Sequence, residues 1–220
     1  MNNMKIAFLL TIIIFMTGCK SNMIDPKISL PEYVTLNIDT LNNSENKTIR
    51  VKAKKLSFPL SLEDLHDISI LEQKYDQEEN CAGLAALQIG ISKQIIVFAV
   101  ANNEELKKWR PDLTDTMPKS IWINPSYEPI GNEKHEDYEA CFSVENATGP
   151  VARFKKIHYV AYTINGNKIE GTAEGFLARV IQHEIDHLNG KVFLEYVYPE
   201  KRMTKEEYLE MRNKAMEQEK

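Results

Sequence analysis

The sequence predicts an α+β fold in which antiparallel β-sheets pack around a central helix. Two observations support this fold class. Segments with strand composition fill the middle of the chain, separated by turn signals. They precede a long amphipathic helix that carries the motif His-Glu-x-x-His at residues 183–187. The chain has 220 residues, which suffices for one domain with a sizeable core and additional terminal segments.

The first half of the domain is predicted to hold one helix and two strands. Apolar residues recur at helical spacing over 61–77, and Ser61 can cap that helix. The apolar run 95–100 predicts a buried strand, and 120–125 predicts a second strand that ends at its proline. Between these strands, residues 102–119 are polar and charged, which indicates a loop or a short helix.

The second half is predicted to hold more strands and a final helix. Residues 127–138 and 157–164 have strand composition. Asn165-Gly166-Asn167 supplies a hairpin turn, and 168–171 supplies the returning strand. Residues 201–220 form a C-terminal helix, which Thr204 and Glu207 begin as a capping box.

The motif helix is expected over 174–189, with Thr172 as its cap. Apolar residues make one continuous stripe along it, namely Leu177, Ile181, Ile185 and Leu188. His183 and His187 lie four residues apart on a neighbouring, half-buried stripe, so that their imidazoles can hold one metal ion while Glu184 reaches a water. A solvated charged helix is the alternative for so short a motif, but the buried surroundings favour metal ligands.

Two stretches upstream of the motif helix contain further motif residues. Residues 83–90 read Gly-Leu-Ala-Ala-Leu-Gln-Ile-Gly, and residues 139–143 read Glu-Ala-Cys-Phe-Ser. Together with Gln182-His183-Glu184-Ile185-Asp186-His187, they resemble in order and spacing the three motifs of the peptide deformylase family. The resemblance covers about residues 52–200 and implies that family's fold.

The resemblance implies the site and its chemistry. Cys141, His183 and His187 would bind one divalent metal, Fe²⁺ or Zn²⁺, which suits a thiolate and two imidazoles. The implied reaction removes the N-formyl group from N-formylmethionyl peptides and releases formate. Glu184 would take a proton from the attacking water and pass it to the leaving amine.

Further roles are implied for the two upstream motifs. Gln88 and the backbone N–H of Phe142 would stabilise the oxyanion. Gly83 would offer backbone hydrogen bonds to the substrate. A tight turn before a strand is the alternative for the Gly83 segment taken by itself.

Three residues depart from the family motifs. Cys81 stands where the family has its first glycine, Leu87 where proline is usual, and Ala140 where glycine is commonest. In an exported protein, a disulfide between Cys81 and Cys141 is the alternative to a metal-ligand role for Cys141.

The family also suggests an ion pair between the aspartate of the helix motif and an arginine after the cysteine motif. Asp186 and Arg153 hold the matching positions. A solvated Asp186 is the alternative.

The N-terminal region predicts export. Lys5 precedes an apolar run over 6–16 that is too short for a comfortable membrane span, and Met16-Thr17-Gly18-Cys19 resembles a bacterial lipobox. Residues 1–19 are therefore interpreted as a lipoprotein-type signal peptide with lipidation at Cys19, and an uncleaved N-terminal anchor is the alternative. Residues 20–51 are interpreted as a tether. The expected location is the bacterial cell envelope, membrane-anchored through the N-terminal lipid on the periplasmic side.

Export leaves three candidate functions. The first is a deformylase that acts on formylated peptides. The second is an exported metallopeptidase or amidase that acts on other short peptides, such as cell-wall peptides, and the third is a catalytically silent binding lipoprotein. The net charge of −5 and the sequence pI of about 5.6 argue against a nucleic-acid-binding surface.

Overall fold

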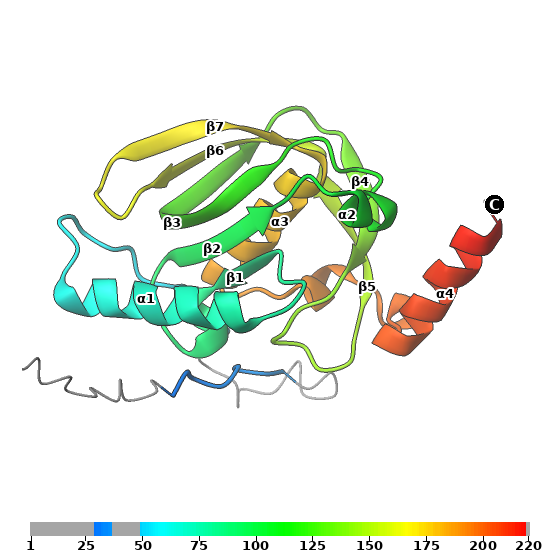
Figure 1. Cartoon of the computed structure of the whole chain (residues 1–220), viewed down its shortest axis with the longest axis horizontal. Coiled ribbons are helices and arrows are strands. Elements are labelled where there is room, and N and C mark those ends of the chain that lie inside the picture. Colours follow the sequence, from blue (N-terminus) through cyan, green and yellow to red (C-terminus); the bar gives the residue numbers. More distant parts are fainter. Residues whose placement is uncertain (1–28, 37–48, 219–220) are drawn as a thin grey trace, which may run out of the picture.

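A five-stranded antiparallel sheet forms the main layer of the fold. The computed structural model describes residues 29–36 and 49–218 (Figure 1). The strands of this sheet lie in the order β1 (Gly83–Ala85), β2 (Ile95–Val100), β3 (Met117–Pro129), β6 (Lys156–Tyr162) and β7 (Lys168–Glu174). A second antiparallel sheet pairs β4 (Lys134–Glu139) with β5 (Gly149–Phe154).

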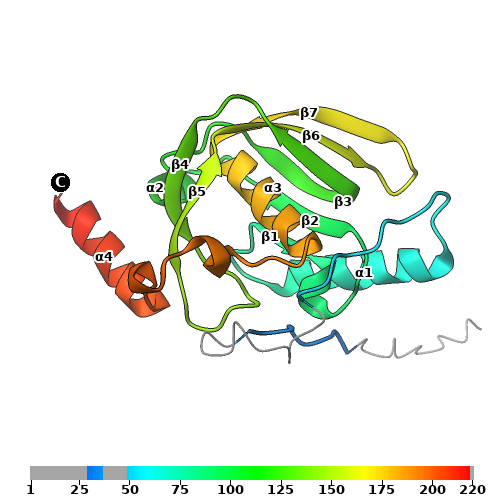
Figure 2. The same cartoon turned by 180° about the vertical axis from the view of Figure 1, so that it is seen from behind.

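Helix α3 (Gly175–Leu188) carries the histidine motif and lies between the two sheets (Figure 2). The apolar stripe predicted from the sequence is buried, and its residues join the core between α3 and the five-stranded sheet. This confirms an α+β fold built around a central motif helix.

The start of α3 differs from the prediction. Thr172 lies inside β7 and caps nothing, because the strand runs directly into the helix at Glu174. Gly175 makes this junction with a φ of +60°, and a Cβ there would lie 2.0 Å from the backbone oxygen of Asp112. A glycine is therefore required where the strand turns into the helix.

The strand predicted over 127–138 is divided between the end of β3 and β4, and β1 and β5 were not predicted. The other predicted elements are present with adjusted bounds. Helix α1 (Leu62–Gln77) begins at Ser61, which forms a capping box with Asp64. Short helix α2 (Glu104–Trp109) occupies the polar segment between β2 and β3. The 3₁₀ helices, η2 (Ala86–Ile89), η3 (Phe193–Tyr196) and η4 (Pro199–Lys201), were not anticipated.

Strand β3 does not end at Pro125 as predicted. It continues to Pro129, and its register with β6 shifts between Ile123 and Ser126. Asn124 has a φ of +50° at the shift. A local irregularity of this kind tolerates a proline, since the missing N–H falls where the ladder is already interrupted.

The tether predicted over 20–51 is too long. The described residues 29–36 pack on the domain, and Leu36 is only 1% exposed and forms a parallel bridge with Val144. Ile49 is also fully buried. The predicted signal peptide and Cys19 lie outside the described residues. Among the described helices, none is both long and apolar enough to span a membrane.

Helix α4 (Lys205–Gln218) projects from the body of the protein (Figures 1 and 2). Thr204 and Glu207 form the predicted capping box at its start. Its attachments to the domain include the ring of Tyr208, which lies 5.0 Å from that of Tyr138, and Arg212, which donates to the backbone oxygen of Trp109.

Candidate active site and metal centre

Three potential ligands converge at the C-terminal half of α3. The Cys141 Sγ lies 3.2 Å from His187 Nε2, which in turn lies 3.2 Å from His183 Nε2. The ligand atoms of the three residues all lie within 4.8 Å of one another. The helix supplies both histidines, and the segment that follows β4 supplies the cysteine.

The chemistry of this donor set fits a single divalent metal. His183 Nδ1 lies 2.9 Å from Glu139 Oε2. Because a carboxylate accepts, Nδ1 donates, which leaves the lone pair of Nε2 facing His187 and Cys141. One thiol and two imidazole nitrogens that face a common point, one of them oriented by a carboxylate, are typical of a catalytic metal site with three protein ligands.

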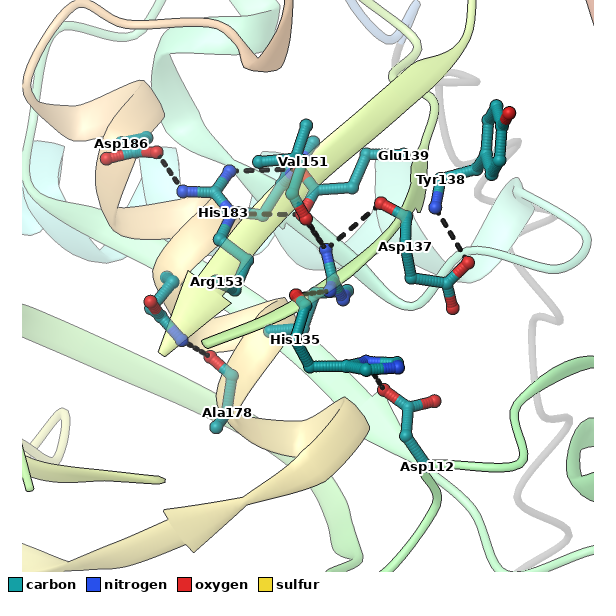
Figure 3. Close-up of polar contacts among 12 residues, drawn as sticks. Asp112, His135, Asp137, Tyr138, Glu139, Val151, Arg153, Ala178, His183 and Asp186 are labelled. Carbon is teal, nitrogen blue, oxygen red and sulfur yellow. Dashed lines mark hydrogen bonds and ion pairs between the residues drawn. The ribbon is translucent and has the colours of Figure 1, made fainter. Parts of the chain in front are cut away.

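Glu139 is the centre of a buried ion-pair network beside the ligands (Figure 3). It accepts two hydrogen bonds of 2.9 Å from Arg153 and one of 2.8 Å from Arg179. Arg153 also pairs with Asp186, which confirms the ion pair that the family resemblance suggested. Burial opposes ionisation of Glu139, but Arg153 outweighs it and holds the pKa of that carboxyl well below its usual range. Glu139 therefore stays charged and keeps His183 oriented.

Replacing Arg153 by methionine is expected to destabilise the protein strongly. The change leaves two buried carboxylates, Glu139 and Asp186, without their shared partner. Breaking a buried ion pair by removing one member costs about 3–5 kcal/mol. Urea unfolding followed by circular dichroism would measure the loss, with Lys155→Met as the control because that lysine's partner, Glu133, is exposed. If the two variants lowered the free energy of unfolding by amounts within about 1 kcal/mol of each other, the role assigned to the network would be contradicted.

Glu184 lies next to the ligands without belonging to them. Its side chain is buried, and Oε2 has no hydrogen-bond partner among the described residues. Burial raises the pKa of Glu184 to about 7, with Glu139 adding to the rise and His183 opposing it. A Cβ at Gly83 would lie 2.5 Å from Glu184 Oε1, so only a glycine there leaves the carboxylate in place.

The predicted oxyanion residues also border the site. Gln88 is fixed by two contacts: its Oε1 accepts from the Ala85 N–H at 2.8 Å, and its Nε2 lies 3.2 Å from Cys141 Sγ. Phe142 follows the cysteine directly and stacks on Tyr33, with ring centroids 5.0 Å apart. The structure thus brings every predicted site residue of the domain into one region.

These residues line one cavity of about 250 Å³. Its reacting end is formed by residues from all three sequence motifs, namely Gly83, Gln88, Cys141, Phe142, His183 and Glu184. The cavity is large enough to admit a side chain or a short peptide segment beside the donors.

Comparison with known proteins agrees with this geometry. The family model for polypeptide deformylase matches residues 38–203. The chain belongs to the peptide deformylase family. It is similar to Peptide deformylase 2 of Rickettsia conorii, with 82% identity over 192 residues that are 87% of this chain and 95% of that relative. Peptide deformylase 2 of Ralstonia nicotianae is 37% identical over 127 residues, covering 57% of this chain and 69% of the relative.

Solved peptide deformylase structures share the fold. The crystal structure from Ehrlichia chaffeensis aligns with a TM-score of 0.63 and 27% identity, covering 87% of this chain and 99% of that one. The class I type b enzyme from Acinetobacter baumannii, bound to Met-Ala-Ser, aligns with a TM-score of 0.61 and 25% identity over 76% of this chain and 99% of that one. As a member of the peptide deformylase family, this chain is a metallohydrolase.

The departures from the peptide deformylase motifs lie in or beside the cavity. Cys81 lines it, is a free thiol, and donates from Sγ to the backbone oxygen of Gly83 at 3.1 Å. Burial raises the pKa of this thiol, and Glu184 adds to the rise. Ala140 lines the cavity as well, whereas Leu87 is fully buried in the core. Cys141 is also a free cysteine, in agreement with a ligand role rather than a disulfide.

Sequence reasoning missed several residues that support this peptide deformylase site. Neither the ion pairs of Glu139 nor the burial of Arg179 follows from the sequence patterns. The sequence allows a short strand at 33–36 within the predicted tether, but it does not indicate what this segment contacts. Val34 N–H donates to Gln88 O and Leu36 N–H donates to Ser143 O, both at 2.8 Å. We call residues 33–36 the bridging segment, because it joins the loop of Gln88 to the loop of Cys141. The apolar alternation of Tyr33-Val34-Thr35-Leu36 was the available signal.

Proposed function

We infer that this chain removes the N-formyl group from N-formylmethionyl peptides and releases formate. The observation that carries the inference is the convergence of a thiol, two imidazoles and a buried carboxylate at one end of a cavity. Membership of the peptide deformylase family supports the same reaction. It gives no support to the two alternatives, an exported metallopeptidase or a silent binding lipoprotein.

Different residues of the chain are assigned to metal binding and to proton transfer in this reaction. Cys141, His183 and His187 would hold the divalent metal, which when bound supplies a Lewis acid that acidifies water. Glu184 accepts the proton of the attacking water, since its raised pKa near 7 suits a group that must both take and return a proton. Water adds to the formyl carbon, the C–N bond breaks, and Glu184 passes the proton to the leaving amine.

The remaining site residues orient the substrate and stabilise charge. We assign Gln88 and the backbone N–H of Phe142 as donors to the oxygen that gains negative charge. Gly83 is assigned to backbone hydrogen bonds with the peptide. The hydrogen bond from the Ala85 N–H to Oε1 fixes the Gln88 amide, so that donor needs little reorganisation during the reaction. The ring of Tyr33 stacks on the ring of Phe142 beside it.

The test is a formate assay on the purified protein. Formyl-Met-Ala-Ser should yield formate and Met-Ala-Ser, while acetyl-Met-Ala-Ser serves as the matched control. Cleavage of internal peptide bonds without formate release would favour the metallopeptidase instead. Protein that binds no metal and hydrolyses no amide would favour the binding lipoprotein.

We propose Fe²⁺ or Zn²⁺ as the metal. A thiolate with two imidazoles suits both ions. Metal analysis of protein purified without oxygen, followed by exchange of one ion for the other, tests this assignment. A different ion as the most active form would contradict it.

We also propose the domain organisation and the location. Residues 1–19 act as a lipoprotein-type signal peptide, residues from 20 to the start of the packed segment form a tether, the catalytic domain extends to about residue 200, and α4 (Lys205–Gln218) lies outside it. The support is the apolar run over 6–16 and the sequence Met16-Thr17-Gly18-Cys19. The mature protein is then anchored in the cell envelope through lipid on Cys19.

Mass spectrometry of the mature N-terminus is expected to show a chain that begins at a lipid-modified Cys19. A bacterial lipoprotein carries more than one acyl chain, which is enough for stable anchoring. The variant Cys19→Ser should lose the modification and leave the membrane fraction. Protein that still begins at Met1 in the cytoplasmic fraction would contradict the proposal.

A further inference from the structure

The bridging segment lies outside the part of the chain that the family motifs describe (blue in Figure 1). It precedes residues 38–203, which the polypeptide deformylase model matches. Even so, it contacts both loops to which the oxyanion donors are assigned. Val34 N–H donates to Gln88 O at 2.8 Å, and Leu36 N–H donates to Ser143 O at the same distance. The family resemblance assigns no role to these contacts.

The two donors of the segment have the spacing of an extended chain. Leu36 forms a parallel bridge with Val144, and Val34 precedes it by two residues. In an extended chain, the N–H groups of residues i and i+2 point to the same side and lie about 6.5–7 Å apart. The segment therefore holds its two acceptor loops at one fixed spacing.

These loops belong to different sheets. Gln88 lies in η2, directly after β1 of the five-stranded sheet, whereas Cys141 lies in the loop that connects β4 to β5 of the two-stranded sheet. The apolar cores differ as well: Leu36 packs with Cys141 and Val144, while the neighbours of Gln88 in η2 belong to another cluster. The bridging segment thus spans the junction between the two sheets beside the site.

A chain of hydrogen bonds connects Leu36 to the backbone N–H of Phe142. Leu36 N–H donates to Ser143 O, which belongs to the same peptide group as the Val144 N–H. Val144 N–H donates to Cys141 O at 3.2 Å, and this oxygen belongs to the same peptide group as the Phe142 N–H. Because a peptide group is planar, fixing its oxygen also fixes the direction of the N–H on its opposite side. Hydrogen bonds in a chain also polarise one another, which strengthens the last donor.

The second bond of the segment acts on Gln88. Val34 N–H holds the backbone oxygen of Gln88, and Ala85 N–H holds its side-chain Oε1 at 2.8 Å. Backbone and side chain are both fixed in this way. The amide nitrogen Nε2 then lies 3.2 Å from Cys141 Sγ, at the reacting end of the cavity.

We propose that Val34 and Leu36 are positioning residues for the oxyanion donors and act through their backbone N–H groups. Leu36 orients the Phe142 N–H, and Val34 orients Gln88. The proposal rests on the proposed deformylase function and adds two residues to the support of that site. Because negative charge on the substrate oxygen develops only in the transition state, losing this support lowers kcat and leaves KM nearly unchanged.

Proline substitutions remove the two donors, and alanine at the same positions provides the matched controls. Leu36→Pro and Leu36→Ala both shorten a buried side chain, but only proline removes the N–H, and the same holds for Val34→Pro and Val34→Ala. With formyl-Met-Ala-Ser, we expect kcat of each proline variant to lie about 10- to 10²-fold below that of its alanine partner, since a displacement of about 1 Å can cost about 10²-fold. KM and metal per chain should stay within about twofold.

Two further measurements separate positioning from a general loss of order. Lys54 N–H donates to Ser92 O at 3.1 Å in another isolated parallel bridge, and that loop carries no assigned oxyanion donor. Lys54→Pro should therefore leave kcat within about twofold of the parent. In a Gln88→Ala background, Val34→Pro should lower kcat no further than Val34→Ala, because the group that Val34 orients is already absent.

The possible failures are distinguishable. Equal kcat within a proline–alanine pair, in a parent that releases formate, would overturn the role of that residue and leave the deformylase function standing. A raised KM with unchanged kcat, or loss of metal as in Cys141→Ala, would also overturn it. If Leu36→Pro does not fold, the Val34 pair and the Gln88→Ala background decide the question. No formate from the parent protein would overturn the proposed function and this inference together.

Discussion

Glu184→Gln is expected to lower kcat by about 10²–10⁴-fold, in the upper part of that range, while the metal content stays near that of the parent. The substitution keeps the shape of the side chain and suits a helix equally well, but it removes the group that takes and returns the proton. The upper part of the range applies because one residue serves as both base and acid. Metal per chain by elemental analysis, measured beside formate release, checks both halves of this prediction.

The ligand variants are the controls. Cys141→Ala, His183→Ala and His187→Ala each remove one of the three converging donors, so metal and activity should disappear together. Glu184 would lose its assigned role if Glu184→Gln stayed fully active. It would also lose that role if the variant lost its metal as Cys141→Ala does.

Gly83→Ala is expected to lower activity by about 10²-fold with little change in stability. The new methyl group would lie 2.5 Å from Oε1 and 2.8 Å from Cδ of Glu184, so the carboxylate must move away from its position. A displacement of about 1 Å in a catalytic group can cost about 10²-fold in rate. Stability should change by less than about 1 kcal/mol, because the atoms in conflict, Oε1, Cδ and Cγ, all belong to the side chain of Glu184 and alanine reduces the entropy of the unfolded state.

A double-mutant cycle tests the cause of that loss. In the Glu184→Gln background the proton acceptor is already absent, so adding Gly83→Ala should lower the remaining activity only slightly. Thermal unfolding of each variant provides the stability control. If the two substitutions lowered the rate independently, the methyl group would be acting on the substrate or on the fold rather than on Glu184.

Local patterns in the sequence predicted the helices and strands well. The α1 cap at Ser61, the apolar stripe of α3 and the hairpin between β6 and β7 all depend on residues close together in the chain. The same is true of the histidine pair, which a single helix places. The family motifs added the ion pair between Arg153 and Asp186, and the ligand roles of Cys141, His183 and His187 remain predictions.

The errors share a physical cause, which is that tertiary contacts decided the outcome. Thr172 looked like a helix cap, but pairing with β6 keeps it in a strand. Arg179 would be solvated on an isolated helix. Glu139, brought by β4 from 40 residues away, and the backbone oxygens of His135 and Val151 make its burial tolerable. The bridging segment lies in a stretch with the composition of a linker, and its hydrogen bonds are to two distant loops. Such partners cannot be read from a local window of sequence.

The bridging segment gives the catalytic site a mechanical connection to the N-terminus. Two backbone hydrogen bonds, from Val34 to Gln88 and from Leu36 to Ser143, join it to the loops that carry the oxyanion donor and the cysteine. A pulling force applied at the N-terminal side of residue 33 would load these two bonds before it reached the five-stranded sheet. Withdrawal of this segment would therefore remove one contact from the Gln88 loop and one from the Cys141 loop, while the hydrogen bonds of the five-stranded sheet stayed in place.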